Sequence, residues 1–508
     1  MRHGLPPAGG DSSLASVLSP AFIPMSFLAR LFLPGLVALA ALVSELAAAS
    51  PARPNILVLF TDDQAFDTIR SLGTLDLDTP HLDRLVARGT TFTHAYNMGS
   101  FSPAVCVASR TMLMTGRSLW DTERIYARTD DERAGGRLWP QLMRAAGYRA
   151  YFTGKWHVQT DAAQVFDVVR HVRPGMPRDV PEGYNRPLPG QADGWSPADP
   201  KFGGFWAGGK HWTEVTADDA VDYLREAGSR PEPFFMYVAF NAPHDPRQSP
   251  QAYVDRYPAA RVPVPRNFLP EYPHKEAIGA GKTLRDEKLA PFPRTEESVR
   301  VQRGEYYAIV SHLDTHVGRV LAALEASGKA ADTWIFLSSD HGLAVGQHGL
   351  FGKQNLYDHS VRVPFVVVGP GVAAGRRLAV PIYLQDMMPT ALALAGVERP
   401  VHVYFRSLLP LLRDAAAPAP YPEIYGAYLR LQRSVVHEGW KLIQYPAGGV
   451  TRLYDVGRDP EERADLAADP AHAPRRAALE ERLRRLQGAL GDPLLSGAAA
   501  PAGGKRKR

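Results

Sequence analysis

The sequence is almost without cysteine, since Cys106 is the only one among 508 residues. A single cysteine cannot form an internal disulfide, so disulfide bonds play no part in the stability of this chain, even in an oxidising compartment. Taken alone, Cys106 is best interpreted as a small buried apolar residue. The small and basic residues that follow it at fixed spacing favour a chemical role instead.

Long apolar runs are also scarce, and the run over residues 31–43 is too short and too interrupted to indicate a membrane span. It follows Arg30 and precedes three small residues, Ala47–Ala49, an order that is typical of a signal peptide. We therefore expect residues 1–49 to be an N-terminal extension and signal peptide that is cleaved near Ala49. The protein is then exported to the periplasm or the extracellular space, without stable membrane insertion. An alternative start at Met25 and an uncleaved anchor stay open, whereas the lack of a nearby cysteine argues against a bacterial lipid anchor.

A strong excess of one charge sign is absent as well. The chain has 58 Lys and Arg against 53 Asp and Glu, and residues 505–508 supply four of the five net positive charges. We therefore expect no nucleic-acid partner, and we expect residues 493–508 to be a disordered basic tail. With 45% hydrophobic and 22% charged residues, the rest has the composition of a globular protein with a large domain and a smaller one.

Short apolar runs alternate with helical patterns from residue 53 to residue 400. Because the runs lack polar alternation, they predict strands that are buried on both faces, and hence an α/β domain with a large, mostly parallel sheet between helices. Strands are expected at 55–60, 149–152, 234–240, 333–337 and 363–368, and helices at 81–88, 138–146, 217–227, 297–327 and 384–395. Thr216, with Asp219 three residues later, suits the start of the third helix. This catalytic α/β domain is expected over residues 50–420.

The pattern changes after residue 420. Strands at 433–437, 440–445 and 452–456, joined by turns that contain glycine, are followed by a charged helix at 475–490. They predict a small C-terminal α+β domain with an antiparallel sheet, over residues 421–492.

Two segments, 171–210 and 258–295, are rich in proline and glycine and show no strong period. Loops of this length inside a domain are usually functional or disordered. Aromatic and basic residues in these segments or directly after the first of them either shape a sugar subsite or anchor the loops: Trp195, Trp206, His211, Trp212, Lys275 and Lys282.

Polar residues follow four of the predicted strands at the point where each strand ends. In chain order these are Asp62 and Asp63, then Lys155 and His157, then His244, and then Asp340 and His341. Open α/β sheets bind ligands at the carboxyl ends of their strands. We therefore expect these side chains to converge in one crevice.

The acidic members of this group suit a divalent cation. Asp62, Asp63 and Asp340 offer the carboxylate oxygens that a hard cation prefers. Asp62 alone is as readily explained by a helix cap or a turn, but adjacent carboxylates repel each other unless a cation or donors hold them together. His341 is the unusual member, because imidazole is a poor calcium ligand, and it is expected either at the metal or on a substrate oxygen.

Residues 106–117 have the sequence Cys-Val-Ala-Ser-Arg-Thr-Met-Leu-Met-Thr-Gly-Arg. This stretch resembles the signature Cys-x-Pro-Ser-Arg-x-x-x-Leu/Met-Thr-Gly-Arg of the formylglycine-dependent type I sulfatases of the alkaline phosphatase superfamily, with Ala108 where proline is usual. Gly154–His157 resembles the Gly-Lys-x-His block of that family, and histidine at position 341 resembles the iduronate-2-sulfatase-like members. The resemblance covers roughly residues 53–470 and implies an alkaline-phosphatase-like fold.

The resemblance also implies one calcium ion and the oxidation of Cys106 to 3-oxoalanine (formylglycine), whose hydrate attacks sulfur. The metal ligands that it implies are Asp62, Asp63, residue 106, Asp340 and His341. The catalytic residues that it implies are Cys106, Arg110, Lys155, His157, His244 and Lys353. In these roles the calcium ion and the positive charges of Arg110, Lys155 and Lys353 neutralise the sulfate oxygens. His244 protonates the leaving oxygen, and His157 accepts a proton as the aldehyde reforms. Arg117 helps to hold the helix and the nucleophile in place.

The activity so implied is hydrolysis of a sulfuric ester, in a sulfated carbohydrate or another small sulfate ester. One alternative is a phosphonate monoester or phosphodiester hydrolase, since related enzymes use the same aldehyde. Another is a non-catalytic binder of sulfated glycans, should Cys106 never be oxidised. The implied partners are the sulfated substrate and a sulfatase-maturing enzyme that acts on Cys106. Ala108 favours the radical, oxygen-independent maturing system over the oxygen-dependent one.

Overall fold

The computed structural model describes residues 53–496, and these residues lie in one compact unit. The expected signal peptide and most of the expected basic tail fall outside them. Among residues 53–496, no helix is both long and apolar enough to cross a bilayer. The start of the tail needs a correction, because Pro493–Ser496 form helix α14. The buried Asp492 carboxylate accepts the Leu494 backbone N–H at 3.0 Å and pairs with Arg433, which fixes the chain at this point.

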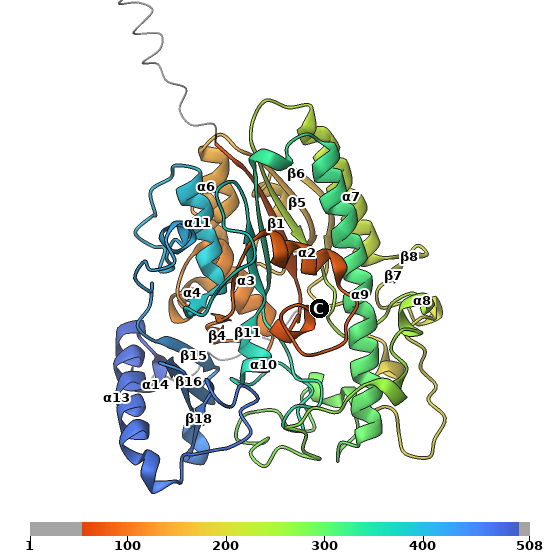
Figure 1. The fold of residues 1–508 in the computed structure, drawn as a ribbon, viewed down its shortest axis with the longest axis vertical. Coiled ribbons are helices and arrows are strands. Elements are labelled where there is room, and N and C mark those ends of the chain that lie inside the picture. Colours follow the sequence, from red (N-terminus) through yellow and green to blue (C-terminus); the bar gives the residue numbers. More distant parts are fainter. Residues whose placement is uncertain (1–52, 497–508) are drawn as a thin grey trace, which may run out of the picture. The chain divides into compact units, whose positions relative to one another are not determined.

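A sheet of eight strands forms the centre of the unit (Figure 1). Its order is β13-β2-β12-β10-β1-β9-β5-β6; the strands from β10 to β6 run parallel, and β12 is antiparallel to both of its neighbours. The strands are β1 (Asn55–Thr61), β2 (Thr90–Phe92), β5 (Arg149–Lys155), β6 (Val168–Arg173), β9 (Phe234–Ala239), β10 (Thr333–Ser339), β12 (Phe365–Val368) and β13 (Arg376–Leu378). The expected large, mostly parallel sheet is confirmed.

Both faces of this sheet are buried against helices. In β1, Ile56, Val58 and Phe60 pack in one core with α3, α6 and α11, whereas Leu57 and Leu59 pack in another with α2, α7 and α9. Figure 1 shows α6 and α11 on one side of the sheet and α7 and α9 on the other. The helices are α2 (Pro80–Arg88), α3 (Val105–Thr115), α6 (Trp139–Ala145), α7 (Trp212–Gly228), α9 (Glu296–Ala326) and α11 (Met387–Leu394). Burial on both faces is the reason that the strands are apolar without alternation.

Several expected boundaries differ from the structure by two or more residues, such as the end of β5 at Lys155 rather than at residue 152. Two others have a clear local cause. Helix α7 begins at Trp212 rather than at residue 217, so Thr216 lies inside the helix. Its N-cap is His211, whose Nδ1 accepts the Thr213 backbone N–H at 3.1 Å, and histidine is not a common N-cap residue. Strand β12 begins at Phe365 rather than at residue 363, because Pro364 cannot donate to the ladder and separates β12 from β11 (Arg362–Val363).

A second sheet lies in the C-terminal part of the chain, in the order β18-β17-β16-β15-β4. Its strands are β4 (Gly99–Ser100), β15 (Ile424–Tyr428), β16 (Gln432–His437), β17 (Trp440–Tyr445) and β18 (Val450–Asp455), and helix α13 (Ala473–Leu490) packs with it. The four C-terminal strands are antiparallel as expected, but β4 comes from the segment before Cys106 and pairs parallel with β15. Gly99 has φ 105°, and a Cβ there would lie 1.8 Å from the Ala427 carbonyl oxygen, so only glycine fits.

The remaining elements are short. Two small sheets contain β3 (Ala95–Tyr96), β11 and β14 (Ile382–Tyr383), and β7 (Trp206–Ala207) with β8 (Lys210–His211). The short helices are α4 (Leu119–Ile125), α5 (Thr129–Ala134), α8 (Gln251–Val254), α10 (Asp358–Val361) and α12 (Leu409–Arg413). Segment 258–295 has 3-10 turns but no α-helix or strand, as its composition predicts.

Candidate active site

The candidate site lies at the carboxyl ends of β1, β5, β9 and β10, which are parallel neighbours. The register sets Thr61 of β1 beside Ser339 of β10, and Phe60 beside Ala239 of β9. Lys155 is the last residue of β5, next to β9. The polar residues that follow these strands therefore meet at one edge of the sheet, as the sequence predicts.

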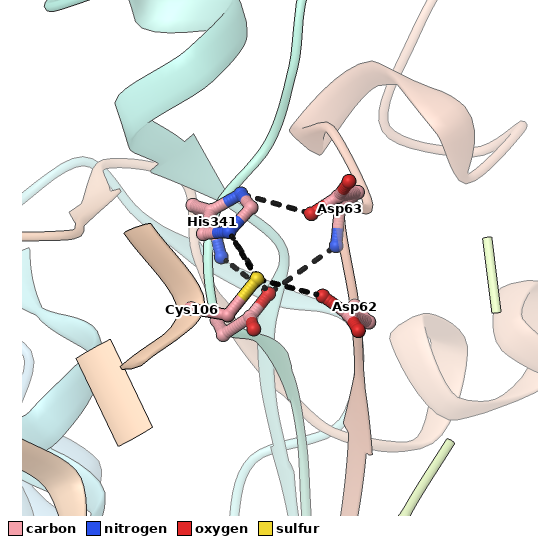
Figure 2. A group of neighbouring side chains, drawn as sticks. Asp62, Asp63, Cys106 and His341 are labelled. Carbon is pink, nitrogen blue, oxygen red and sulfur yellow. Dashed lines mark hydrogen bonds and ion pairs between the residues drawn. The ribbon is translucent and has the colours of Figure 1, made fainter. Parts of the chain in front are cut away.

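Five buried groups form the centre of the site: Asp62, Asp63, Cys106, Asp340 and His341, whose possible ligand atoms all lie within 4.8 Å of one another. Figure 2 shows the Cys106 sulfur between Asp62 and His341, with Asp63 facing the His341 ring. Asp63 has φ 66°, and its backbone N–H donates to Asp340 Oδ1 at 3.2 Å. Burial, and then Asp340 and Cys106, raise the pKa of Asp62 well above its usual value. A bound cation would relieve this crowding of negative charge.

Cys106 is the second residue of α3 and is 2% exposed. Its Sγ lies 3.4 Å from Asp62 Oδ1, 3.2 Å from His341 Nε2 and 3.6 Å from Lys353 Nζ. Burial alone would raise the pKa of the thiol, but Lys155, Lys353 and His341 hold this pKa well below its usual value. A helix N-terminus also favours negative charge. Cys106 is therefore in the setting of a reactive thiolate rather than of an inert core residue.

Arg110 lies one turn further along α3 and is fully buried. Its Nε donates to Asp340 Oδ2 at 3.0 Å, one terminal nitrogen donates to the Lys155 carbonyl at 3.0 Å, and the other donates to the Thr61 carbonyl at 3.4 Å. Its guanidinium also stacks over the Phe60 ring, 5.1 Å from the centroid. Arg110 thus ties the ends of β1, β5 and β10 together and neutralises Asp340.

Two buried lysines stand against the Asp62-Asp63 pair. The Lys155 ammonium contacts Asp62, and the Lys353 ammonium donates to both carboxylate oxygens of Asp63 at 2.9 and 2.8 Å. Burial alone would lower the pKa of each lysine, but its carboxylate partner raises it above the usual value. Each lysine is therefore charged, which allows two adjacent carboxylates to be buried together.

Two further histidines, His157 and His244, lie beside these groups. Burial is the main cause of the lowered pKa of His157, and the interaction with Cys106 opposes it. His244 Nδ1 lies 2.6 Å from the Asp245 carbonyl oxygen. Because a carbonyl oxygen can only accept, Nδ1 carries a proton, and Nε2 faces Lys353 Nζ at 3.1 Å.

His341 hydrogen-bonds through Nδ1 to the Gly342 carbonyl at 2.8 Å, and the same nitrogen lies 3.2 Å from Asp63 Oδ1. Burial alone would lower the pKa of His341, but Asp340 and Asp63 raise it to about 9. Because the Gly342 carbonyl oxygen can only accept, Nδ1 carries a proton, and Nε2 faces Cys106 Sγ at 3.2 Å. Nε2 is therefore the ring nitrogen that is placed to meet a metal or a substrate oxygen.

The fold and this cluster agree with what comparison to known proteins finds. A family model described as Sulfatase matches residues 54–397, and one described as N-sulphoglucosamine sulphohydrolase, C-terminal, matches residues 346–489. The chain belongs to the sulfatase family. It is an enzyme of the hydrolase class with the fold of the alkaline phosphatase superfamily, as the signature at residues 106–117 indicates.

Individual relatives and solved structures are similar over most of their length. This sulfatase is 29% identical to the choline-sulfatase of Rhizobium meliloti (strain 1021) over 441 residues, which cover 82% of this chain and 83% of the relative. The structure of BT4656 in complex with its substrate D-glucosamine-2-N,6-O-disulfate superposes with a TM-score of 0.65 at 22% identity, covering 87% of this chain and 98% of the other. The phosphonate monoester hydrolase SpPMH from Silicibacter pomeroyi superposes with a TM-score of 0.66 at 21% identity, covering 87% and 97%. These two structures show the shared fold.

Several residues that support the site are missing from the sequence-based prediction. Ser109 Oγ and Asn97 Nδ2 both donate to the Asp340 carbonyl, at 2.8 and 2.6 Å, and Tyr306 donates to the Asp63 carbonyl at 2.7 Å. Ser109 belongs to the signature, which could have identified it. Asn97 and Tyr306 lie in segments where no motif marks them, so only the fold shows their contact with the site.

The end of the signature holds α3 in place. Gly116 has φ 69° and caps the helix, with its N–H donating to the Met112 carbonyl at 2.8 Å. Arg117 donates to both carboxylate oxygens of Glu132 in α5, at 2.9 and 3.1 Å. Arg117 therefore ties the C-terminal end of α3 to a neighbouring helix and lies apart from the cluster around Cys106.

Four of the aromatic and basic residues in or next to the two long loops make stacking, ion-pair or helix contacts within the protein. Trp195 stacks on Phe202 with centroids 4.9 Å apart, and Lys275 pairs with Glu271 at 2.9 Å. His211 caps α7, as described above, and Trp212 is its first residue. Of the two interpretations that the sequence leaves open, these contacts favour loop anchoring over a sugar subsite.

Proposed function

We propose that this sulfatase cleaves the O-sulfate of a sulfated carbohydrate or another small sulfate ester, with a nucleophile that derives from Cys106. The observation that carries the proposal is the setting of Cys106. Its sulfur lies at the N-terminus of α3, within 3.6 Å of a carboxylate, an imidazole and an ammonium group. The choline-sulfatase of Rhizobium meliloti and the disulfated glucosamine bound by BT4656 support a small sulfate ester as the substrate.

Asp62, Asp63 and Asp340 would hold a divalent cation, for which we propose Ca²⁺. Their oxygens suit a hard cation. The raised pKa of Asp62, caused by burial and by Asp340 and Cys106, fits a site whose negative charge is only partly neutralised by protein groups. When bound, the cation would help to neutralise the sulfate group.

Oxidation of Cys106 to 3-oxoalanine would supply a hydrated aldehyde, with one hydroxyl to attack sulfur and a second whose deprotonation expels sulfate. His157, whose pKa is influenced by residue 106 beside it, would accept that proton. Lys155 and Lys353 hold positive charge beside residue 106, where negative charge builds in the transition state. His244 would give a proton to the departing oxygen from Nε2, which accepts from the charged Lys353 in the free site and so must be protonated before it acts as the donor.

A phosphonate monoester hydrolase is the second candidate, because SpPMH shares this fold over 97% of its length. The Gly154–His157 block favours the sulfatase reaction over it. A non-catalytic binder of sulfated glycans would result if Cys106 were never oxidised.

The test compares an aryl sulfate with the matching aryl phosphonate monoester. The protein is co-expressed with a sulfatase-maturing enzyme, and the mass of the peptide that contains residue 106 gives the fraction converted to the aldehyde. We expect kcat/KM for the sulfate to exceed that for the phosphonate by about tenfold or more. The reverse ratio would assign the protein to the second candidate. A residue 106 that stays unoxidised, in protein that hydrolyses neither ester, would assign it to the third.

The proposal also covers where the protein is located, how Cys106 is oxidised and how the substrate can be identified. We propose export through the signal peptide in residues 1–49, and maturation by the oxygen-independent system, since Ala108 replaces the proline that the other system prefers. A panel of sulfated mono- and disaccharides, together with choline sulfate, identifies the substrate by its kcat/KM.

A further inference from the structure

Arg285 lies where the two long proline- and glycine-rich segments meet beside His244. One of its terminal nitrogens donates to the Tyr184 hydroxyl at 2.7 Å, which joins segment 258–295 to segment 171–210. The same nitrogen contacts Asp245 Oδ2, and the second terminal nitrogen donates to Asp245 Oδ1 at 3.3 Å. The second nitrogen also pairs with Asp286 Oδ1 at 2.6 Å. One guanidinium therefore holds three separate parts of the chain.

The paired carboxylate belongs to the residue that orients His244. His244 Nδ1 lies 2.6 Å from the Asp245 carbonyl oxygen and 3.6 Å from Asp245 Oδ1. The Asp245 side chain is 1% exposed, whereas that of Arg285 is 31% exposed. Two-pronged pairing with a guanidinium fixes the plane of a carboxylate as well as its distance. The position of Asp245, and with it the tilt of the His244 ring, therefore depends on Arg285.

Asp286, the other carboxylate that pairs with Arg285, connects to the Nε2 side of the His244 ring. Asp286 Oδ2 accepts from Gln354 Nε2 at 2.8 Å, and Gln354 follows Lys353 in the chain. Lys353 Nζ in turn lies 3.1 Å from His244 Nε2. Arg285 thus connects to both nitrogens of the His244 ring, through Asp245 on one side and through Asp286 and the Lys353 segment on the other.

We propose that Arg285 is a positioning residue for departure of the leaving group, because it holds Asp245 and thereby aims His244 Nε2 at the departing oxygen. This inference rests on the role of His244 in the proposed function. A direct role in binding the sulfate group is disfavoured, since Asp245 and Asp286 already neutralise the guanidinium. The remaining alternative is that Arg285 only holds the two loops together. The dependence of kcat/KM on the leaving group distinguishes this structural role from the positioning role.

The test measures kcat/KM for a series of aryl sulfates, from 4-nitrophenyl sulfate to phenyl sulfate, with the matured protein. Arg285→Gln should lose about tenfold or more on phenyl sulfate but less than about threefold on 4-nitrophenyl sulfate, since only a poor leaving group needs a well-placed proton. Arg285→Lys keeps the charge but not the two-pronged geometry, so it should fold even if Arg285→Gln does not, and it should show the same trend to a smaller degree.

Arg266→Gln is the matched control, because Arg266 lies in the same segment, its side chain is 72% exposed, and its one ion pair among residues 53–496 is with Glu461 at 3.6 Å. It should leave the series unchanged. An equal loss on every aryl sulfate for both Arg285 variants, or a rise in KM alone, would overturn the positioning role and leave the structural role.

Failure of the proposed function gives a different result. In that case wild-type protein with an aldehyde at residue 106 would not hydrolyse the aryl sulfates. If it hydrolysed aryl phosphonate monoesters instead, the same leaving-group series on those esters would test Arg285, since their departing oxygen needs the same proton. If it hydrolysed neither ester, the positioning role would fall together with the role of His244.

Discussion

Replacing Cys106 with alanine should separate catalysis from folding. The residue is 2% exposed, so loss of its sulfur removes a small buried group, which costs on the order of 1 kcal/mol of unfolding free energy. The same change removes a group that raises the pKa of Asp62, after burial and Asp340, and so reduces the crowding of negative charge. The two effects oppose each other. We expect the unfolding temperature to change by no more than about 3 °C.

Turnover, in contrast, should collapse. Without a nucleophile at residue 106, kcat for an aryl sulfate should fall by at least about 10⁴-fold, while the three carboxylates proposed to hold the metal stay in place. The measurements are initial rates on matured protein, thermal unfolding, and the calcium content of the purified variant. Val107→Ala is the control, since it shortens the next side chain of α3 without removing a polar contact, and it should keep kcat within about threefold. Retention of more than about 1% of the wild-type kcat by Cys106→Ala would refute the nucleophile assignment.

Four further outcomes are expected. Chelation of divalent cations should abolish activity, calcium should restore it better than zinc because the ligands are oxygens, and Asp63→Asn should mimic chelation; full activity in metal-free protein would exclude the metal site. His244→Ala should reduce kcat at least about tenfold more on phenyl sulfate than on 4-nitrophenyl sulfate, and equal losses would mean that His244 binds substrate. Burial raises the pKa of Asp314 to about 7, so between about pH 4 and 7 the folded state keeps a proton on Asp314 that the unfolded state has released. The free energy of unfolding that Asp314 contributes therefore falls as the pH rises through that range. Asp314→Asn should flatten the pH dependence of urea unfolding between about pH 4 and 7, and an unchanged slope would contradict this. Ala108→Pro should increase the fraction of residue 106 converted by the oxygen-dependent maturing enzyme, as measured by peptide mass; efficient conversion of the unaltered chain by that enzyme would contradict the prediction.

Much of the fold could be predicted from the sequence because each buried strand is a continuous apolar run. Residues 55–60 and 333–337 are examples, and both lie in the parallel centre of the sheet. The shortest strands could not be predicted in this way. β4 has two residues and no apolar pattern, and it becomes a strand only because Gly99 allows the backbone to approach Ala427 closely. The start of α7 at Trp212 was missed for a similar reason, since its cap is a histidine side chain.

The sequence by itself determined the family and the groups at the strand ends, and it marked Cys106 as the candidate nucleophile. These are local properties, because Asp62, Lys155 and Asp340 each end or directly follow a strand, His244 lies in the loop after β9, and parallel strands end at a common edge. Only the tertiary structure decided how charge is balanced around them. The pairing of Lys353 with Asp63, and of Arg285 with Asp245, joins residues that are 290 and 40 positions apart in the chain. Such pairs depend on where the loops pack, and the separation of two loops along the sequence does not determine their distance in space.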